Sequence, residues 1–138
     1  MSYKTVGYPQ FNLRMKKCCL ILLVSLITGF TGILSAQNRF WVAAGASNWN
    51  NTANWSTTSG GAGGASVPGT GGSEVPVFNA NGLGNCNLDI APLVPGITVN
   101  GYTGTIDLLG NNLTTTGTNL FTTGTISNTG GAASVVLN

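Results

Sequence analysis

The sequence predicts an all-β protein of short strands, and three observations lead to this prediction. Apolar and polar residues alternate over short segments such as Cys86-Asn87-Leu88-Asp89-Ile90, which is typical of a strand. Clusters rich in Gly, Asn and Pro separate these segments, and such clusters form turns. No window after residue 36 repeats apolar residues at helical spacing, and the frequent residues Gly and Thr are weak helix formers.

The expected strands follow the apolar positions in chain order. They are Val75 with Val77 and Phe78, Cys86 with Leu88 and Ile90, Ile97 with Val99, Ile106 with Leu108, and Val135 with Leu137. The sequences between them, NGLGN, APLVPG, NGYTG, GNN and SNTGG, are turn-forming. Pro92 and Pro95 bracket one of these turns, because proline cannot donate to a strand ladder.

The spacing of the later apolar residues predicts how the strands are arranged. Three short strands in each coil would give coils of about 20 residues, within the range of stacked repeats. A parallel β-solenoid would then place Ile97 under Leu120, Ile106 under Ile126, and Leu113 under Val135. The same intervals suit hairpins, so an antiparallel β-sandwich is the alternative.

The front of the chain has the organisation of a signal peptide. Lys16-Lys17 precede the apolar run CCLILLVSLITGFTGILSA, which ends in small residues before Gln37. We therefore expect a helical signal peptide over residues 15–36, cut between Ala36 and Gln37, and we interpret residues 1–14 as an upstream extension. Contact with a membrane is expected only through this segment before cleavage, and the protein is expected to be secreted or held at the cell surface.

The charges of the chain are segregated. Its net charge is +2, but four of the five basic residues precede residue 18. Residues 37–138 keep one cation, Arg39, and three anions, Glu74, Asp89 and Asp107, so their net charge is −2. A basic surface for nucleic acid is absent from this part, and we expect no nucleic-acid partner.

The side chains of the mature part also exclude several chemistries. Residues 37–138 contain no His and no Lys, which excludes a Ser–His–Asp triad and a His/Cys zinc site within them. Asp89 and Asp107 are interpreted as solvated strand residues, and the Gly-rich stretch Gly60–Gly72 as an irregular loop without the Lys of a phosphate loop. We expect no enzyme activity, no catalytic residue, no metal and no cofactor.

One cysteine, Cys86, would remain in the mature chain, so no internal disulfide is expected. It alternates in phase with Leu88 and Ile90, which predicts a small buried side chain. A nucleophilic thiolate needs a nearby base, and the chain contains no His to supply one.

Three tryptophans, Trp41, Trp49 and Trp55, lie close together in a segment rich in Asn. One interpretation is that they close the apolar end of the first coil, each indole N–H finding an acceptor. The other is a sugar platform, in which the indole faces and the amides of Asn48 and Asn54, with Asn50 and Asn51, would bind an extracellular glycan or another surface ligand.

Two stretches resemble a known class of protein. They are WVAAGASNWNNTANWSTTSGGAGGASVP (Trp41–Pro68) and GYTGTIDLLGNNLTTTGT (Gly101–Thr118). Both are similar to the beginning of large exported adhesins and surface-layer proteins of Bacteroidetes-type bacteria, often carried by a type IX secretion system. The resemblance implies a β-solenoid repeat region behind a Trp-rich N-terminal segment. This chain departs from that pattern after Pro68, where only Glu74 keeps a carboxylate, and it shows no sorting domain.

These observations define the expected organisation and function. Residues 37–72 are expected to form a cap and loop, and residues 73–138 a short-strand repeat region that continues in a longer gene product. The favoured function is a non-enzymatic, adhesin-like structural region that caps a β-repeat array. The alternatives are a carbohydrate-binding module and the N-terminal part of a polysaccharide lyase or hydrolase.

Overall fold

Short strands joined by turns make up most of residues 35–138, the part of the chain that the computed structural model describes. The one helical element among these residues is a 3-10 turn, η1 (Thr52–Asn54). The all-β prediction is therefore confirmed. The predicted upstream extension (1–14), and all of the predicted signal peptide (15–36) except its last two residues, lie outside the described residues.

The strands are two to five residues long, as expected for a chain in which turn-forming residues interrupt every apolar segment. In chain order they are β1 (Gln37–Trp41), β2 (Ser47–Asn48), β3 (Trp55–Ser56), β4 (Glu74–Phe78), β5 (Cys86–Asn87), β6 (Leu93–Val94), β7 (Ile97–Val99), β8 (Thr105–Asp107), β9 (Leu113–Thr115), β10 (Asn119–Phe121), β11 (Thr125–Ser127) and β12 (Val135–Leu137).

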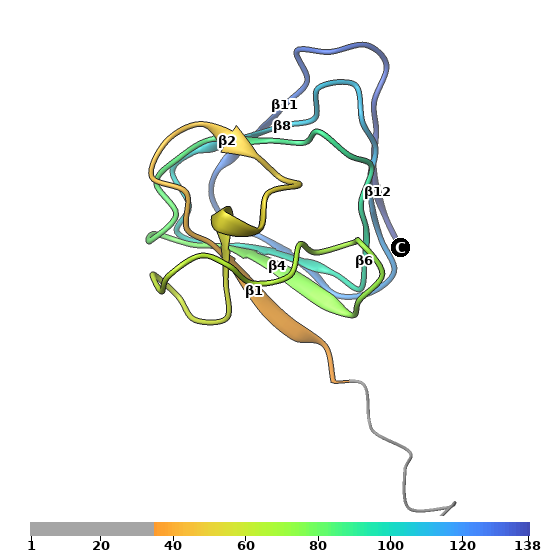
Figure 1. Ribbon diagram of the computed structural model, residues 1–138. Helices are drawn as coiled ribbons and strands as arrows, with labels where there is room; N and C mark the ends of the chain where they lie inside the picture. The colour runs from red at the N-terminus through yellow and green to blue at the C-terminus, as the bar shows by residue number, and fades with distance from the viewer. Residues whose placement is uncertain (1–34) are drawn as a thin grey trace, which may run out of the picture. The chain divides into compact units, whose positions relative to one another are not determined.

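These strands form three sheets, and from β4 on the chain visits the three sheets in rotation. The sheet orders are β10-β7-β4-β1-β3, β11-β8-β5-β2 and β12-β9-β6. Figure 1 shows the three sides, with β1 and β4 along one, β2, β8 and β11 along another, and β6 and β12 along the third. We call the successive passes layer 1 (37–73), layer 2 (74–94), layer 3 (97–115) and layer 4 (119–137).

Strands of successive layers pair in parallel. Eight of the nine strand pairs among the described residues are parallel, and the exception is the pair of β1 with β3. An antiparallel sandwich joins neighbouring strands by hairpins. The antiparallel sandwich therefore does not describe residues 35–138.

The register agrees with two of the three predicted stacks. Ile106 pairs with Ile126, and Leu113 pairs with Val135. The third stack is wrong by one residue, since Ile97 pairs with Asn119 and Leu120 pairs with Thr98. Because adjacent strand residues point to opposite faces, Leu120 lies on the outer face of its sheet and is exposed.

A similar correction applies to β4. The alternation of Val75 and Val77 predicted that both face the core. The register instead aligns Val77 with Thr98, and Phe78 with the buried Val99. Phe78 belongs to the core cluster and is fully buried. Val77 lies outside that cluster but is also buried, at 8% exposed, whereas Val75 is only half-buried.

Layer 1 contributes no strand to the third sheet, and an irregular loop (57–73) lies at that place. Val67 belongs to the hydrophobic core. Gly69 lies so close to β6 that a Cβ added to it would be 2.6 Å from the Cβ of Pro92 and 3.1 Å from the backbone nitrogen of Leu93. A glycine is therefore required there, and the loop covers the free edge of β6. This agrees with the prediction that Gly60–Gly72 forms an irregular loop.

Candidate functional site

The tryptophan cluster (Trp41, Trp49 and Trp55) is the most densely built feature of layer 1. All three side chains are fully buried. Trp55 stands edge-on to both others, with ring centroids 5.2 Å from Trp41 and 4.9 Å from Trp49. All three also contact the ring of Phe78, which in turn contacts Tyr102. Such edge-to-face pairs add stability beyond that of the buried area.

Each indole N–H of the cluster donates to a backbone carbonyl. Trp41 Nε1 donates to Gly84 O (2.8 Å), Trp49 Nε1 to Pro68 O (2.9 Å), and Trp55 Nε1 to Trp49 O (2.7 Å). The first of these bonds links layer 1 to layer 2, and the second holds the irregular loop over the rings. Burying the indoles therefore leaves none of their polar atoms unpaired.

The polar residues of this segment fold the backbone around the rings. Asn51 accepts from the N–H of Ala53 at the start of η1, as a helix-capping side chain does. The side-chain amide of Asn54 donates to Ser47 Oγ and to Asn48 O, so it covers the outer edge of β2. After η1 the chain turns back, and β3 pairs antiparallel with β1, placing Trp55 beside Trp41.

The predicted sugar platform does not match this arrangement. No face of Trp41, Trp49 or Trp55 is open for a sugar to stack on, because all three indoles are fully buried. Asn54 is buried and bonded within the protein, and only Asn48, with Asn50 and Asn51, is exposed. The asparagine amides and the indole rings of the predicted platform therefore do not lie on one exposed surface.

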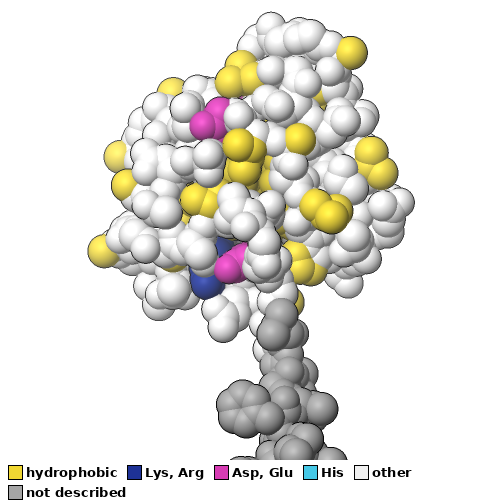
Figure 2. All heavy atoms as spheres, turned by 45° about the vertical axis from the view of Figure 1, so that its right-hand side comes forward, with side chains coloured by type: hydrophobic (Ala, Val, Ile, Leu, Met, Phe, Trp, Pro, Cys, Tyr) yellow, Lys and Arg dark blue, Asp and Glu magenta, His cyan; other side chains and the backbone are white. Residues whose placement is uncertain are grey.

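The one cation of the described residues forms a polar cluster beside β1 and β4. Arg39 Nε donates to Ser66 Oγ (2.9 Å), and this hydroxyl donates to Glu74 Oε1 (2.8 Å). Arg39 Nη2 lies 3.7 Å from the same carboxylate oxygen and donates to Gln37 Oε1. These contacts tie the irregular loop to β1 and β4. Figure 2 shows how few charged side chains reach one face of the molecule.

The two aspartates were predicted to be solvated strand residues, and the structure agrees only in part: Asp89 is exposed but follows β5 outside any strand, whereas Asp107 ends β8 and is half-buried. Asp89 is exposed and accepts from the backbone N–H of Asn50 in layer 1. Asp107 accepts from the hydroxyl and the N–H of Thr129 in layer 4, and from the N–H of Leu109. These hydrogen bonds, that of the Thr129 hydroxyl above all, lower the pKa of Asp107 below its ordinary value, since they favour the charged form.

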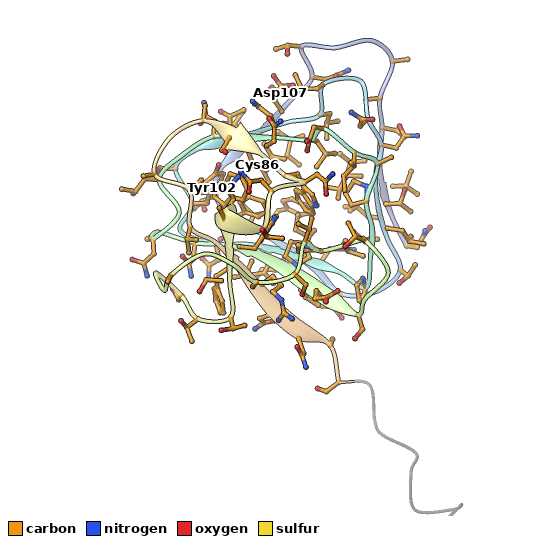
Figure 3. All side chains as sticks on the ribbon, in the orientation of Figure 1. Cys86, Tyr102 and Asp107 are labelled. Atoms are coloured by element: carbon orange, nitrogen blue, oxygen red, sulfur yellow. The ribbon has the colours of Figure 1, made fainter. Side chains whose placement is uncertain are left out.

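Cys86 is fully buried, as predicted, in phase with Leu88. Burial raises the pKa of its thiol well above the ordinary value, and the charge of Asp89 raises it further. Figure 3 shows Cys86 and Tyr102 between the sheets and Asp107 at an outer corner. Burial likewise raises the pKa of Tyr102, whose hydroxyl donates to Gly84 O (2.7 Å). Both shifts disfavour the deprotonated forms of these groups.

The sequence did not connect several residues that build this region with the tryptophan cluster. Phe78 and Tyr102 complete the aromatic core, and Gly84 O accepts from both Trp41 and Tyr102. Two buried oxygens in layers 3 and 4, Thr115 Oγ1 and Asn119 Oδ1, have no hydrogen-bond partner. Only the one-residue shift of β10 brings the amide of Asn119 to a core position.

Residues 35–138 contain no pocket and no group of three or more Cys, Asp or Glu side chains placed to hold a metal ion. Within this range, no helix is long and apolar enough to cross a membrane. Ala36 and Gln37, between which cleavage was predicted, are both exposed, and Gln37 opens β1. Comparisons with protein-family models, with curated proteins and with solved structures found no match to this chain.

Proposed function

We propose that residues 37–138 are the first coils of a parallel β-solenoid, and that they act as its structural N-terminal cap in an exported, adhesin-like surface protein. The observation that carries this proposal is the tryptophan cluster. Its three indoles are buried against Phe78 at one end of the stacked layers, and each donates to a backbone carbonyl. Repeat arrays need terminal units that differ from the internal ones and cover their core.

The layers themselves support the solenoid part of the proposal. Paired residues of layers 3 and 4, such as Ile106 with Ile126 and Leu113 with Val135, lie 20 and 22 residues apart. Side chains also bond from one layer to the next. Asn85 accepts from the N–H of Thr105, and Asn112 from the N–H of Ser134. Stacked coils of nearly constant length have this kind of nearest-neighbour contact.

A structural rather than catalytic role is supported by what the acidic side chains do. Each of the three joins parts of the fold that are distant in sequence: Glu74 lies 3.7 Å from Arg39, Asp89 accepts from the N–H of Asn50, and Asp107 accepts from the N–H of Thr129. The buried thiol of Cys86 has a raised pKa, which disfavours the reactive thiolate. We therefore assign no catalytic residue, metal or cofactor to residues 37–138.

Substitution of Trp49 by Ala tests the capping role. It would remove a fully buried indole, open a cavity beside Trp55 and leave Pro68 O without its donor. Such truncations cost about 3 to 5 kcal/mol, a large part of a typical stability of about 5 to 15 kcal/mol. We expect the free energy of unfolding, measured by urea titration with circular dichroism, to fall by that amount. Leu83→Ala, at a side chain that is 67% exposed, is the matched control and should change it little.

The carbohydrate-binding alternative predicts a different result for the same variant. A glycan array would then show binding by the purified chain, and Trp49→Ala would abolish that binding while its circular dichroism and unfolding midpoint stay unchanged. This outcome would contradict the capping role.

Export is tested separately, by mass spectrometry of the chain secreted from a Bacteroidetes-type host. An N-terminus at Gln37 is expected, and a secreted chain that keeps residues 1–36 would contradict the signal peptide.

A further inference from the structure

The two ends of the stacked layers differ. At the first end, the chain covers each edge strand itself. β3 pairs with β1, Asn54 bonds to β2, and the loop residue Gly69 lies against β6. At the other end, β10, β11 and β12 are each the last strand of a sheet and have a single neighbouring strand within residues 35–138. Their outer edges are available for backbone pairing.

The core-facing side chains of layer 4 are also uncovered. In layer 3, Val99, Ile106 and Thr115 are 2%, 0% and 0% exposed. Their paired residues in layer 4, Phe121, Ile126 and Leu137, are 37%, 38% and 50% exposed. The residues of each pair share a strand position, so the difference arises because layer 3 has a layer above it and layer 4 has none. Apolar residues thus reach the open face from all three sheets.

Layer 4 contributes no charged side chain to the open face, because residues 119–138 contain no Asp, Glu, Lys or Arg. An ionic partner has nothing to recognise there. A partner that fits must present apolar side chains and unpaired backbone groups at the same spacing. The interfaces between the layers already show such an arrangement, with parallel pairing in all three sheets.

We infer that the open face of layer 4 binds one further coil of polypeptide, which adds a parallel strand to each of β10, β11 and β12. This coil carries apolar residues above Phe121, Ile126 and Leu137, with about the 20- to 22-residue spacing found between layers 3 and 4. The inference rests on the proposed function and names the partner of the end that the tryptophan cluster does not close. Strand addition of this kind gains affinity from backbone hydrogen bonds and specificity from alternate side chains.

Extension of the chain tests this inference. A copy of residues 117–138 joined after Asn138 repeats the 22-residue interval that separates Ile97 from Asn119. We expect hydrogen exchange of the amides in β10, β11 and β12 to slow by about tenfold or more in the extended chain. The control carries the same 22 residues in shuffled order and should leave that exchange unchanged. Equal protection with both extensions would overturn the inference.

Substitution of Ile126 by Asp adds a second, independent readout. Ile126 is 38% exposed, so the unextended chain should tolerate this change, and its exchange in layers 2 and 3 should stay as in the parent chain. In the extended chain the same carboxylate would be buried, and the added protection of β10 to β12 should disappear. Protection that survives Ile126→Asp would contradict the proposed contact.

Sedimentation of the unextended chain tests whether a second copy of the chain, rather than a further coil, occupies the open face. Concentration-dependent dimers with protected layer 4 edges, dissociated by Ile126→Asp, would show that a second copy occupies the face and would overturn the inference. None of these results depends on Trp49→Ala, so failure here is distinguishable from failure of the capping role.

Discussion

Ile106 and Ile126 form a natural pair for measuring what a covering layer contributes. They occupy the same position in β8 and β11 and are directly paired. Ile106 has a layer on each side, since Cys86 pairs with it from layer 2, and it is fully buried. Ile126 has only layer 3 beneath it and is 38% exposed. The same substitution, Ile→Ala, therefore removes the same atoms from two environments that differ by one layer.

The expected magnitudes follow from these environments. In layer 3 the change leaves a closed cavity, and Ile→Ala at such sites costs about 2 to 5 kcal/mol. In layer 4 no closed cavity forms, and only part of the transfer free energy of about 0.8 kcal/mol for each buried methylene is lost. We therefore expect Ile106→Ala to lower the free energy of unfolding by about 3 kcal/mol and Ile126→Ala by about 1 kcal/mol.

Equilibrium urea unfolding followed by circular dichroism measures both variants against the parent chain. Coincident transitions at two wavelengths establish whether unfolding is two-state before the values are compared. Equal losses, or a larger loss for Ile126→Ala, would refute the conclusion that layer 4 is covered on one side only. A change in the m-value of either variant would indicate an altered unfolded state and would call for the comparison at the transition midpoint.

Three further predictions concern single polar groups. Thr115→Val removes a fully buried hydroxyl whose oxygen has no hydrogen-bond partner. The free energy of unfolding should therefore increase by about 1 kcal/mol, and the urea midpoint should rise. A lower midpoint would show that the hydroxyl is hydrogen-bonded. The pKa of Asp107 is lowered in the folded state, so its contribution is present above the unfolded pKa of about 3.9 and is lost as the pH falls through the folded value. Asp107→Asn should accordingly weaken the fall of the free energy of unfolding below about pH 4, which urea titrations of the parent chain and the variant at several pH values would measure. The Cys86 thiol should react with a thiol reagent only as fast as the chain unfolds, and rapid modification without denaturant would contradict its burial.

The sequence by itself determined the all-β strand pattern, the interval between some of the paired strands and much of the core. The alternation of Cys86 with Leu88 is a local feature, because it involves only residues that are close in the chain. Both side chains are buried as predicted. The intervals that placed Ile106 under Ile126 and Leu113 under Val135 hold because these parallel-paired strands are separated by a nearly constant number of residues, 20 and 22.

Only the tertiary structure decided what happens at the ends and at the shifted strand. Whether Trp49 is buried depends on Pro68, and whether Trp41 is buried depends on Gly84, which are contacts between residues far apart in the chain. The missing third strand of layer 1 and its replacement by the glycine-rich loop leave no trace in local periodicity. The shift of β10 has the same origin. The turn before Asn119 sets its register, and a slip of one residue moves Leu120 from the core to the surface, because side chains alternate between the faces of a strand.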